Sequence, residues 1–152
     1  MSTVDVWLAN HCPNLFPDQY QIISPKTSDY NCIAWAAEED DRWWDPTDPY
    51  GYWLDEVPRE LTLAAFIKLY QMLGYESCDS AKLEPGWQRV AIYTRNNGDP
   101  DDAQPTHVAR QLPNGRWTSK IGELEDIEHE LNGLRGFYYG KVTQILKRPI
   151  NT

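Results

Sequence analysis

The chain has 152 residues, the usual size of a single domain with a substantial core. Its 23 Asp and Glu outnumber its 14 Lys and Arg, and the resulting net charge of −9 argues against nucleic acid or anionic membrane surfaces as partners. No apolar run approaches the roughly 18 residues that a membrane-spanning helix requires. We therefore expect one domain, residues 1–152, with a core between about 20 and 148; a cationic or neutral substrate is compatible with the charge.

Cysteine usage and the N-terminus bear on metal binding and location. The three cysteines, Cys12, Cys32 and Cys78, cannot all pair within one chain. Neither their spacing nor that of the histidines matches a zinc motif, so we expect no metal and no cofactor. No basic stretch followed by an apolar segment marks a signal peptide, so a cytoplasmic location is expected. A protein exported without an N-terminal signal would have the same pattern.

The N-terminal part of the chain predicts an arm, a strand and a helix. Residues 1–19 are rich in Pro and Asn and are expected to form an irregular arm, followed by a short strand that ends before Pro25. The next apolar run predicts a helix over about 32–39, with Ser28 or Asp29 as its N-cap.

Residues 42–58 combine prolines and a glycine with many aromatic residues, and such a segment cannot form a regular element. We expect a long loop packed by its own rings. Long structured loops beside a helix often form one wall of a cleft. The predicted substrate wall consists of Trp43, Trp44, Tyr52 and Trp53.

The remaining chain predicts one more helix and a set of antiparallel strands. Apolar residues recur at three- and four-residue steps over 61–73, which predicts a helix that ends at Gly74. Alternating and β-branched residues predict strands. The predicted strands are 87–94, 106–112, 116–122 and 137–148, with a loop over 96–104 and a short helix or turn over 126–132. Helices followed by an antiparallel meander indicate an α+β fold.

The Asn31-Cys32 dipeptide opens the first predicted helix and makes Cys32 the candidate nucleophile. A helix start carries partial positive charge and unpaired N–H donors, which favour thiolate over thiol. We therefore expect Cys32 to have an apparent pKa below ~8.5 and to react with iodoacetamide faster than the other cysteines. The Cys32 N–H is one candidate donor to an oxyanion, and the side-chain amide of Asn31 or the hydroxyl of Thr27 or Ser28 is a candidate second donor.

His107 stands at the start of a predicted strand and is the candidate base. A neutral imidazole can accept the thiol proton near neutral pH. A base of this kind needs a polar partner that fixes its tautomer, and Ser119 or His129 could supply it.

The hairpin turn at 114–115 allows two registers for the next strand. A two-residue turn pairs Leu112 with Trp117 and turns Ser119 away from the His107 face. A three-residue loop with a bulge brings Ser119 to that face. Apolar matching between the two strands favours the first register.

A structural explanation of Cys32 competes with the catalytic one. Cysteine is among the most buried residue types, and a cysteine in a helix of Ile, Ala and Trp commonly belongs to the core. In that case Cys32 is inert, and the protein is a non-catalytic module that binds a partner through its aromatic and acidic surface. Thiol labelling that needs denaturant would favour this alternative.

These features together resemble the papain-like hydrolases of the NlpC and CHAP type. Residues 31–35 are similar to that family's cysteine motif, 86–93 to the strand before its histidine strand, and 107–109 with the turn at 114–115 to its histidine hairpin. The resemblance implies N-terminal helices packed on an antiparallel sheet, with the third catalytic residue at or near Ser119. It also implies a thiol-dependent hydrolase or acyltransferase that acts on an amide, peptide or ester bond.

Residues 30–32, 117–122 and 126–129 also resemble a group of bacterial proteins, some of which are toxin-like modules. This second resemblance implies that His129 or Lys120 contributes to function, without indicating an activity. It allows a toxin or effector domain whose protein partner is an immunity protein. In either case the expected substrate is a peptide or a protein.

Overall fold

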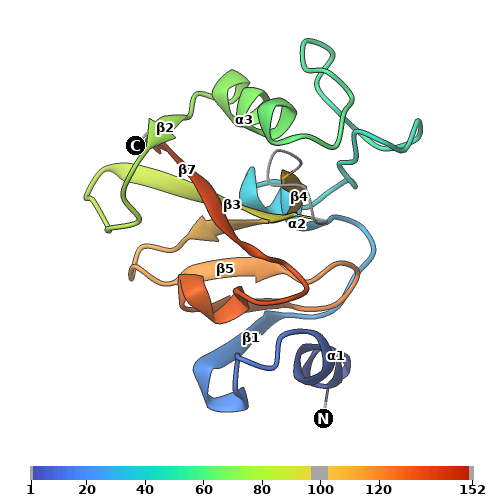
Figure 1. Cartoon of the computed structure of the whole chain (residues 1–152), viewed down its shortest axis with the longest axis vertical. Helices are drawn as coiled ribbons and strands as arrows, with labels where there is room; N and C mark the ends of the chain where they lie inside the picture. Colours follow the sequence, from blue (N-terminus) through green and yellow to red (C-terminus); the bar gives the residue numbers. More distant parts are fainter. Residues whose placement is uncertain (1, 97–102, 151–152) are drawn as a thin grey trace.

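The computed structural model describes residues 2–96 and 103–150 and contains a seven-stranded sheet. Its strands are β1 (Tyr20–Ser24), β2 (Glu76–Cys78), β3 (Trp87–Asn96), β4 (Ala103–Gln111), β5 (Trp117–Lys120), β6 (Asp126–His129) and β7 (Lys141–Pro149). The helices are α1 (Thr3–His11), α2 (Cys32–Ala36) and α3 (Leu63–Met72), with 3-10 turns η1 (Pro17–Gln19) and η2 (Leu131–Leu134). The strand order is β1-β6-β5-β4-β3-β7-β2 and the strand pairs are antiparallel (Figure 1). The fold is therefore α+β, as the sequence predicts.

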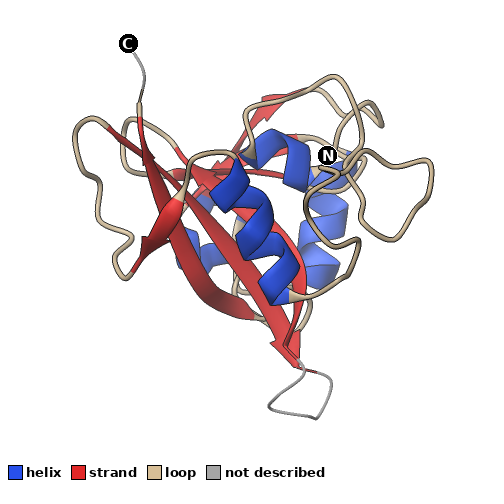
Figure 2. Cartoon of the chain, turned by 90° about the horizontal axis from the view of Figure 1, so that it is seen from above, coloured by secondary structure: helices blue, strands red, loops and turns tan. Residues whose placement is uncertain are grey.

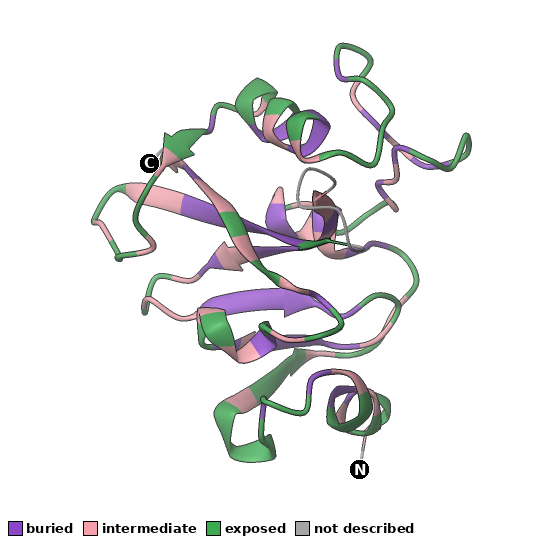
Figure 3. Ribbon diagram, viewed as in Figure 1, coloured by how far each residue is buried: buried purple, intermediate pink, exposed green. Residues whose placement is uncertain are grey.

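The sheet carries a hydrophobic core on each face. Side chains alternate along the strands, so Val90 and Val108 belong to the core beneath α2 and α3, here called the α2-side core. Ala91 and Ala109 belong to the core beneath α1, here called the α1-side core. Figure 2 shows α3 lying over the strands, and Figure 3 shows that the middle of the sheet is buried.

Helix α3 confirms the predicted apolar periodicity. The Thr62 hydroxyl caps its first turn by accepting a hydrogen bond from the Ala65 N–H at 3.2 Å. Phe66 and Leu69 are buried in the α2-side core. Gly74, with φ +96°, follows the helix end, where glycine tolerates this conformation. The strands β3, β4 and β5 also lie where they are predicted, within a few residues at each end.

The N-terminal arm is a helix, contrary to the expectation for residues 1–19. The Ser2 hydroxyl accepts a hydrogen bond from the Asp5 N–H, and the Asp5 carboxylate accepts one from the Ser2 N–H in return. Val4 and Leu8 are buried in the α1-side core, so the core begins near residue 4 and not near 20. With two buried positions in nine residues, the helix has too short an apolar stripe to stand out in the sequence.

Residues 126–129 form β6 and not the predicted helix or turn. This strand pairs with β1 on one side and with β5 on the other, and this tertiary pairing decides its conformation. Only the next residues, 131–134, form a 3-10 turn. The last strand also begins later than predicted, at Lys141.

The β4–β5 hairpin takes the second of the two predicted registers. Gln111 pairs with Trp117, which places Ser119 on the His107 face of the sheet. The loop consists of residues 113–115, and its last residue, a glycine with φ +89°, provides the bulge. The register that apolar matching favours is therefore wrong.

Residues 42–58 contain no named helix or strand, as predicted, and only an isolated bridge joins Trp44 to Tyr52. The predicted loop over 96–104 falls mainly on residues 97–102, which lie outside the described residues. Within the described ranges, no helix has the length and apolar character to cross a membrane.

Candidate active site

A cavity of about 440 Å³ lies where β5 ends, and both Cys32 and His107 line it. Strand β5 pairs with β4 only at Arg110 and Gln111, so it leaves the first half of β4 unpaired on that side. The segment after β5, residues 121–124, turns and forms part of the cavity wall. The end of a short strand thus opens the sheet beside His107.

Cys32 and His107 reach this cavity from opposite faces of the sheet. Cys32 packs against the α2-side core, to which Val108 belongs, whereas His107 stacks on Tyr139 of the α1-side core with ring centroids 4.4 Å apart. The backbone N–H of Val108, the residue that follows His107, lies close enough to the Cys32 sulfur to lower the pKa of its thiol. Two residues distant in the sequence therefore share one cavity.

Helix α2 positions Cys32 at its first residue. The helix is shorter than predicted and ends at Ala36, because the chain turns at Glu38. Its N-cap is Asn31, and neither Ser28 nor Asp29, the two caps that the sequence suggests. An Asx side chain directly before the first helical residue is a strong cap, which overrides the hydroxyl three residues earlier.

The predicted oxyanion donors are used differently. The Asn31 Oδ1 accepts hydrogen bonds from the N–H groups of Ala34 (3.2 Å) and Trp44 (3.3 Å), and its Nδ2 donates to the Trp44 carbonyl at 2.6 Å. Asn31 therefore ties the helix start to the aromatic loop. Ser28 is exposed and lies outside the cavity lining. Among the predicted oxyanion donors, the backbone N–H of Cys32 is the one close enough to the Cys32 sulfur to lower the pKa of its thiol.

The pKa of the Cys32 thiol is raised, contrary to the expected value below ~8.5. Burial raises it, and the hydrogen bonds from the N–H groups of Val108, Cys32 and Ile33 lower it by less. The positive charge of Lys120 also lowers it. The residue is therefore a thiol at neutral pH, although its side chain is only partly covered.

His107 is a neutral imidazole in a closed setting. It is 1% exposed, and burial lowers its pKa to about 3, with the His129 imidazole acting in the same direction. Its ring packs at a tilt against those of Tyr139 and Tyr93, and its Nε2 has no hydrogen-bond partner among the described residues. No polar side chain in the described part of the chain fixes its tautomer through that atom.

Ser119 and His129 form a buried pair of their own. The Ser119 Oγ lies 2.7 Å from the His129 Nε2, and the His129 Nδ1 lies 2.7 Å from the Glu130 carbonyl. Because a carbonyl only accepts, Nδ1 carries the proton and the serine hydroxyl donates to Nε2. Burial lowers the pKa of His129 to about 4. Ser119 and His129, the two residues that the sequence predicts as hydrogen-bond partners of His107, therefore bind each other.

Lys120 holds the segments around the cavity together. It is completely buried, and its Nζ donates to the carbonyls of Thr27 (2.8 Å), Gly122 (2.7 Å) and Leu124 (2.5 Å). These bonds use the three protons of the ammonium group. Burial lowers the pKa of Lys120, and the charge of Asp126 opposes this. Lys120 thus holds both the segment that precedes α2 and the cavity wall formed by residues 121–124.

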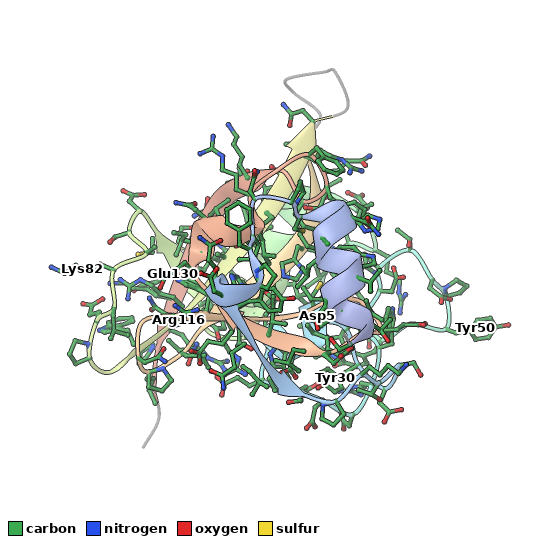
Figure 4. All side chains as sticks on the ribbon, turned by 90° about the horizontal axis from the view of Figure 1, so that it is seen from below. Asp5, Tyr30, Tyr50, Lys82, Arg116 and Glu130 are labelled. Carbon is green, nitrogen blue, oxygen red and sulfur yellow. The ribbon has the colours of Figure 1, made fainter. Side chains whose placement is uncertain are left out.

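The aromatic wall differs from the predicted one. Trp43 lines the cavity, but Trp44 and Trp53 are 2% and 3% exposed and belong to the α2-side core. Tyr52 packs against Trp44 and lies outside the lining, and Tyr50 of the same loop points into solvent in Figure 4. The prediction of a wall from Trp44 and Trp53 is therefore wrong, because their rings fold inward.

The other rings of the wall come from segments that sequence reasoning missed. They are Trp7 of α1, and Tyr138 and Tyr139 of the turn before β7. Trp7 stacks on His11, four residues later, with ring centroids 4.3 Å apart. This i, i+4 aromatic pair is a helical signal that could have drawn attention to α1. Among the described residues, no group of three or more His, Cys, Asp or Glu side chains could hold a metal ion.

The two buried histidines predict a loss of stability in acid. Their pKa values are about 3 and about 4 in the folded chain, against about 6.5 when unfolded, so the unfolded chain binds more protons in that window. The free energy of unfolding should fall by about 2 kcal/mol for each histidine between about pH 7 and pH 5. The raised pKa of Asp126 acts in the opposite direction. Urea unfolding at both pH values measures the change, and a constant free energy would contradict it.

A comparison with known proteins connects the site to a family. No curated protein and no solved structure matches the chain. A family model matches residues 21–147, a span that contains Cys32, His107, Ser119 and His129 but not Trp7. The chain therefore belongs to the family described as "Domain of unknown function (DUF7689)".

Proposed function

We propose that this protein is a thiol-dependent hydrolase or acyltransferase of papain-like fold that acts on an amide, peptide or ester bond. The observation that carries the proposal is the shared cavity: Cys32 and His107 both line it, from separate elements. A nucleophile and a base in one solvent-reachable cavity are the minimum that thiol catalysis requires. The effect of the Val108 N–H on the pKa of the Cys32 thiol further supports the proximity of the cysteine to the strand that carries His107.

The papain-like assignment is supported by the order and placement of three elements. The cysteine begins a helix, the histidine lies on a strand of an antiparallel sheet, and the next strand carries Ser119 on the same face. The order of these elements along the chain agrees with the resemblance in the sequence. The short helix α2 and the unpartnered Nε2 of His107 are departures from a complete triad.

The proposed reaction starts from a neutral pair. The Cys32 sulfur attacks the substrate carbonyl while His107 takes the thiol proton, so no thiolate accumulates beforehand. The Cys32 N–H, which is free of an intrahelical partner at a first helical residue, can donate to the oxyanion. His107 then returns the proton to the leaving group, and a thioester forms on Cys32. Water hydrolyses this thioester in a hydrolase, and an amine takes the acyl group in an acyltransferase.

The Ser119–His129 pair is proposed to position His107. Its imidazole is close enough to contribute to the low pKa of His107. The pair is itself held by the Glu130 carbonyl, which fixes the His129 tautomer. It thus provides a rigid polar support on the face of the sheet from which His107 enters the cavity.

Acylation by p-nitrophenyl acetate tests the proposed function. The Cys32 sulfur should displace p-nitrophenolate and become acetylated, which absorbance and intact mass spectrometry detect. Cys32→Ala should abolish the adduct, and His107→Asn should slow acylation by about 100-fold because the base is lost. Cys78→Ala is the matched control and should react like the unaltered chain, since Cys78 lies on β2 at the edge of the sheet.

Two results would contradict this function. The first is acetylation of Cys32 that is equally fast in His107→Asn, since the histidine then does not act as a base. The second is a Cys32 that reacts only in denaturant.

If expression arrests growth and Cys32→Ala relieves the arrest, the same thiol chemistry belongs to a toxin or effector domain, for which an immunity protein would be the partner.

The second candidate function is a non-catalytic module that binds a protein partner. The raised pKa of the Cys32 thiol is the observation that favours it, because burial makes the sulfur a poorer nucleophile at neutral pH. The fully exposed ring of Tyr50, 98% accessible on the aromatic loop, would then be a contact residue. Unreactive Cys32 in the acylation experiment would select this function over the enzyme.

A further inference from the structure

The cavity around Cys32 is bordered by aromatic rings from three separate parts of the chain. Trp7 comes from α1, Trp43 from the aromatic loop, and Tyr138 from the turn before β7. The rings of Trp7 and Tyr138 meet edge to face, with centroids 5.0 Å apart at 89°. The faces of such rings carry negative potential and attract cationic groups. One face of Trp7 is already stacked on His11, and the Arg95 guanidinium lies 5.9 Å from the centre of the Tyr138 ring, so a cation would bind at the remaining ring surface.

Among the described residues that line this cavity, one is charged, and it is acidic. Glu123, in the segment after β5, is exposed and lines the cavity, and neither lysine nor arginine is among the lining residues. Within the described residues, no salt bridge joins Glu123 to a lysine, arginine or histidine. His107 adds no charge, because its low pKa keeps the ring neutral. A cation entering the cavity would therefore meet a carboxylate that forms no ion pair in the described part of the chain, although its charge also acts on the buried Lys120 ammonium.

The nearest buried ammonium group cannot serve an anionic ligand instead. Lys120 directs its Nζ protons to the carbonyls of Thr27, Gly122 and Leu124. An anion in the cavity would have to break one of these bonds to gain a donor, and it would still lie near Glu123. The cavity lining therefore favours a cationic ligand over an anionic one.

From this arrangement we infer that the cavity selects substrates with a cationic side chain of the lysine type beside the carbonyl that Cys32 attacks. The inference rests on the proposed function, since it assigns a substrate class to the same site. A volume of about 440 Å³ is sufficient for one long side chain together with the reacting group. The net charge of −9 adds a long-range attraction for cationic substrates.

Three chloromethyl ketone probes that differ only in one side chain test the inference. They are the N-acetyl derivatives of lysine, norleucine and glutamate, which are of similar length and differ in charge. The Cys32 sulfur attacks the methylene carbon, the C–S bond forms as the C–Cl bond breaks, chloride leaves with the electron pair, and His107 takes the thiol proton. The second-order rate constant of alkylation, followed by intact mass spectrometry, is the measured quantity.

The lysine probe should react about five- to tenfold faster than the norleucine probe, and the glutamate probe slowest, given the strength of cation–aromatic and carboxylate contacts. Glu123→Gln should reduce the ratio of lysine to norleucine rates toward one. Glu123→Lys should favour the glutamate probe. Glu76→Gln is the matched control, because Glu76 is an exposed carboxylate on the edge strand β2, and it should leave all three rates unchanged.

The outcomes separate this inference from the function on which it rests. Equal rates for the three probes, or a preference for lysine that survives Glu123→Gln, would overturn the cationic selectivity while Cys32 remains a competent nucleophile. If none of the probes modifies Cys32 in a His107-dependent way, the proposed function fails as well. A lysine preference that disappears in Glu123→Gln and reverses in Glu123→Lys supports the inference.

Discussion

Replacing Lys120 with methionine is expected to lower the free energy of unfolding by about 3–5 kcal/mol. The substitution removes three charge-assisted hydrogen bonds and leaves the carbonyls of Thr27, Gly122 and Leu124 without their donor. It also removes one of the two cations, Lys120 and Arg110, that lower the pKa of Asp126. Urea denaturation at neutral pH measures the loss.

The same substitution should also disturb the site. Gly122 and Leu124 line the cavity, so releasing them from Lys120 alters the wall beside Cys32. We expect acylation of Cys32 to slow in the fraction that remains folded. Lys141→Met is the control, because Lys141 is exposed on β7 and should change stability by less than about 0.5 kcal/mol. Similar losses for the two variants would refute the role given to Lys120.

Gly140→Ala is expected to cost about 4 kcal/mol or more. Gly140 has φ +81°, and a Cβ at this position would lie 1.9 Å from the carbonyl oxygen of Thr94. The backbone of Gly140 also exchanges two hydrogen bonds with Gly136, which closes the turn that carries Tyr138 and Tyr139. The clash is with the backbone and cannot be relieved by a side-chain rotation.

Gly86→Ala provides the matched control for this prediction. Gly86 has φ +84°, almost the conformation of Gly140, but nothing lies within 4 Å of the position of its Cβ. It should therefore show only the cost of the left-handed backbone, about 1–2 kcal/mol. Thermal or urea unfolding of both variants compares the two costs. If they are equal, the contact with Thr94 does not determine the stability of the turn.

The elements that the sequence predicts well are those whose own pattern decides their structure. The apolar stripe of α3 and the alternation of β3 and β4 are strong local signals, and the structure confirms them. By contrast, β6 is a strand because β1 and β5 lie on both sides of it, and no local signal reports that pairing. Helix α1 buries only two side chains, Val4 and Leu8, too few for a clear period.

In the candidate site, too, the features that depend on local sequence can be predicted and those that depend on tertiary contacts cannot. Cys32 and His107 can be selected from sequence because residue type and local position both point to them, and they line one cavity. Which aromatic rings line the cavity depends on which segments meet in space. For this reason, the sequence wrongly predicts Trp44 and Trp53 as wall residues and does not point to Trp7. The direction of the Cys32 pKa shift also depends on burial, which outweighs the helix start that the sequence reveals.

The position of Trp7 has a consequence for variation among related proteins. The residues proposed to break the bond lie within 21–147, the span shared with the family, whereas this ring precedes it on α1. Grafting a different leading helix onto the same sheet would exchange one side of the proposed recognition surface and leave the proposed nucleophile and base in place. Relatives could thereby diversify in what they accept without altering how they react.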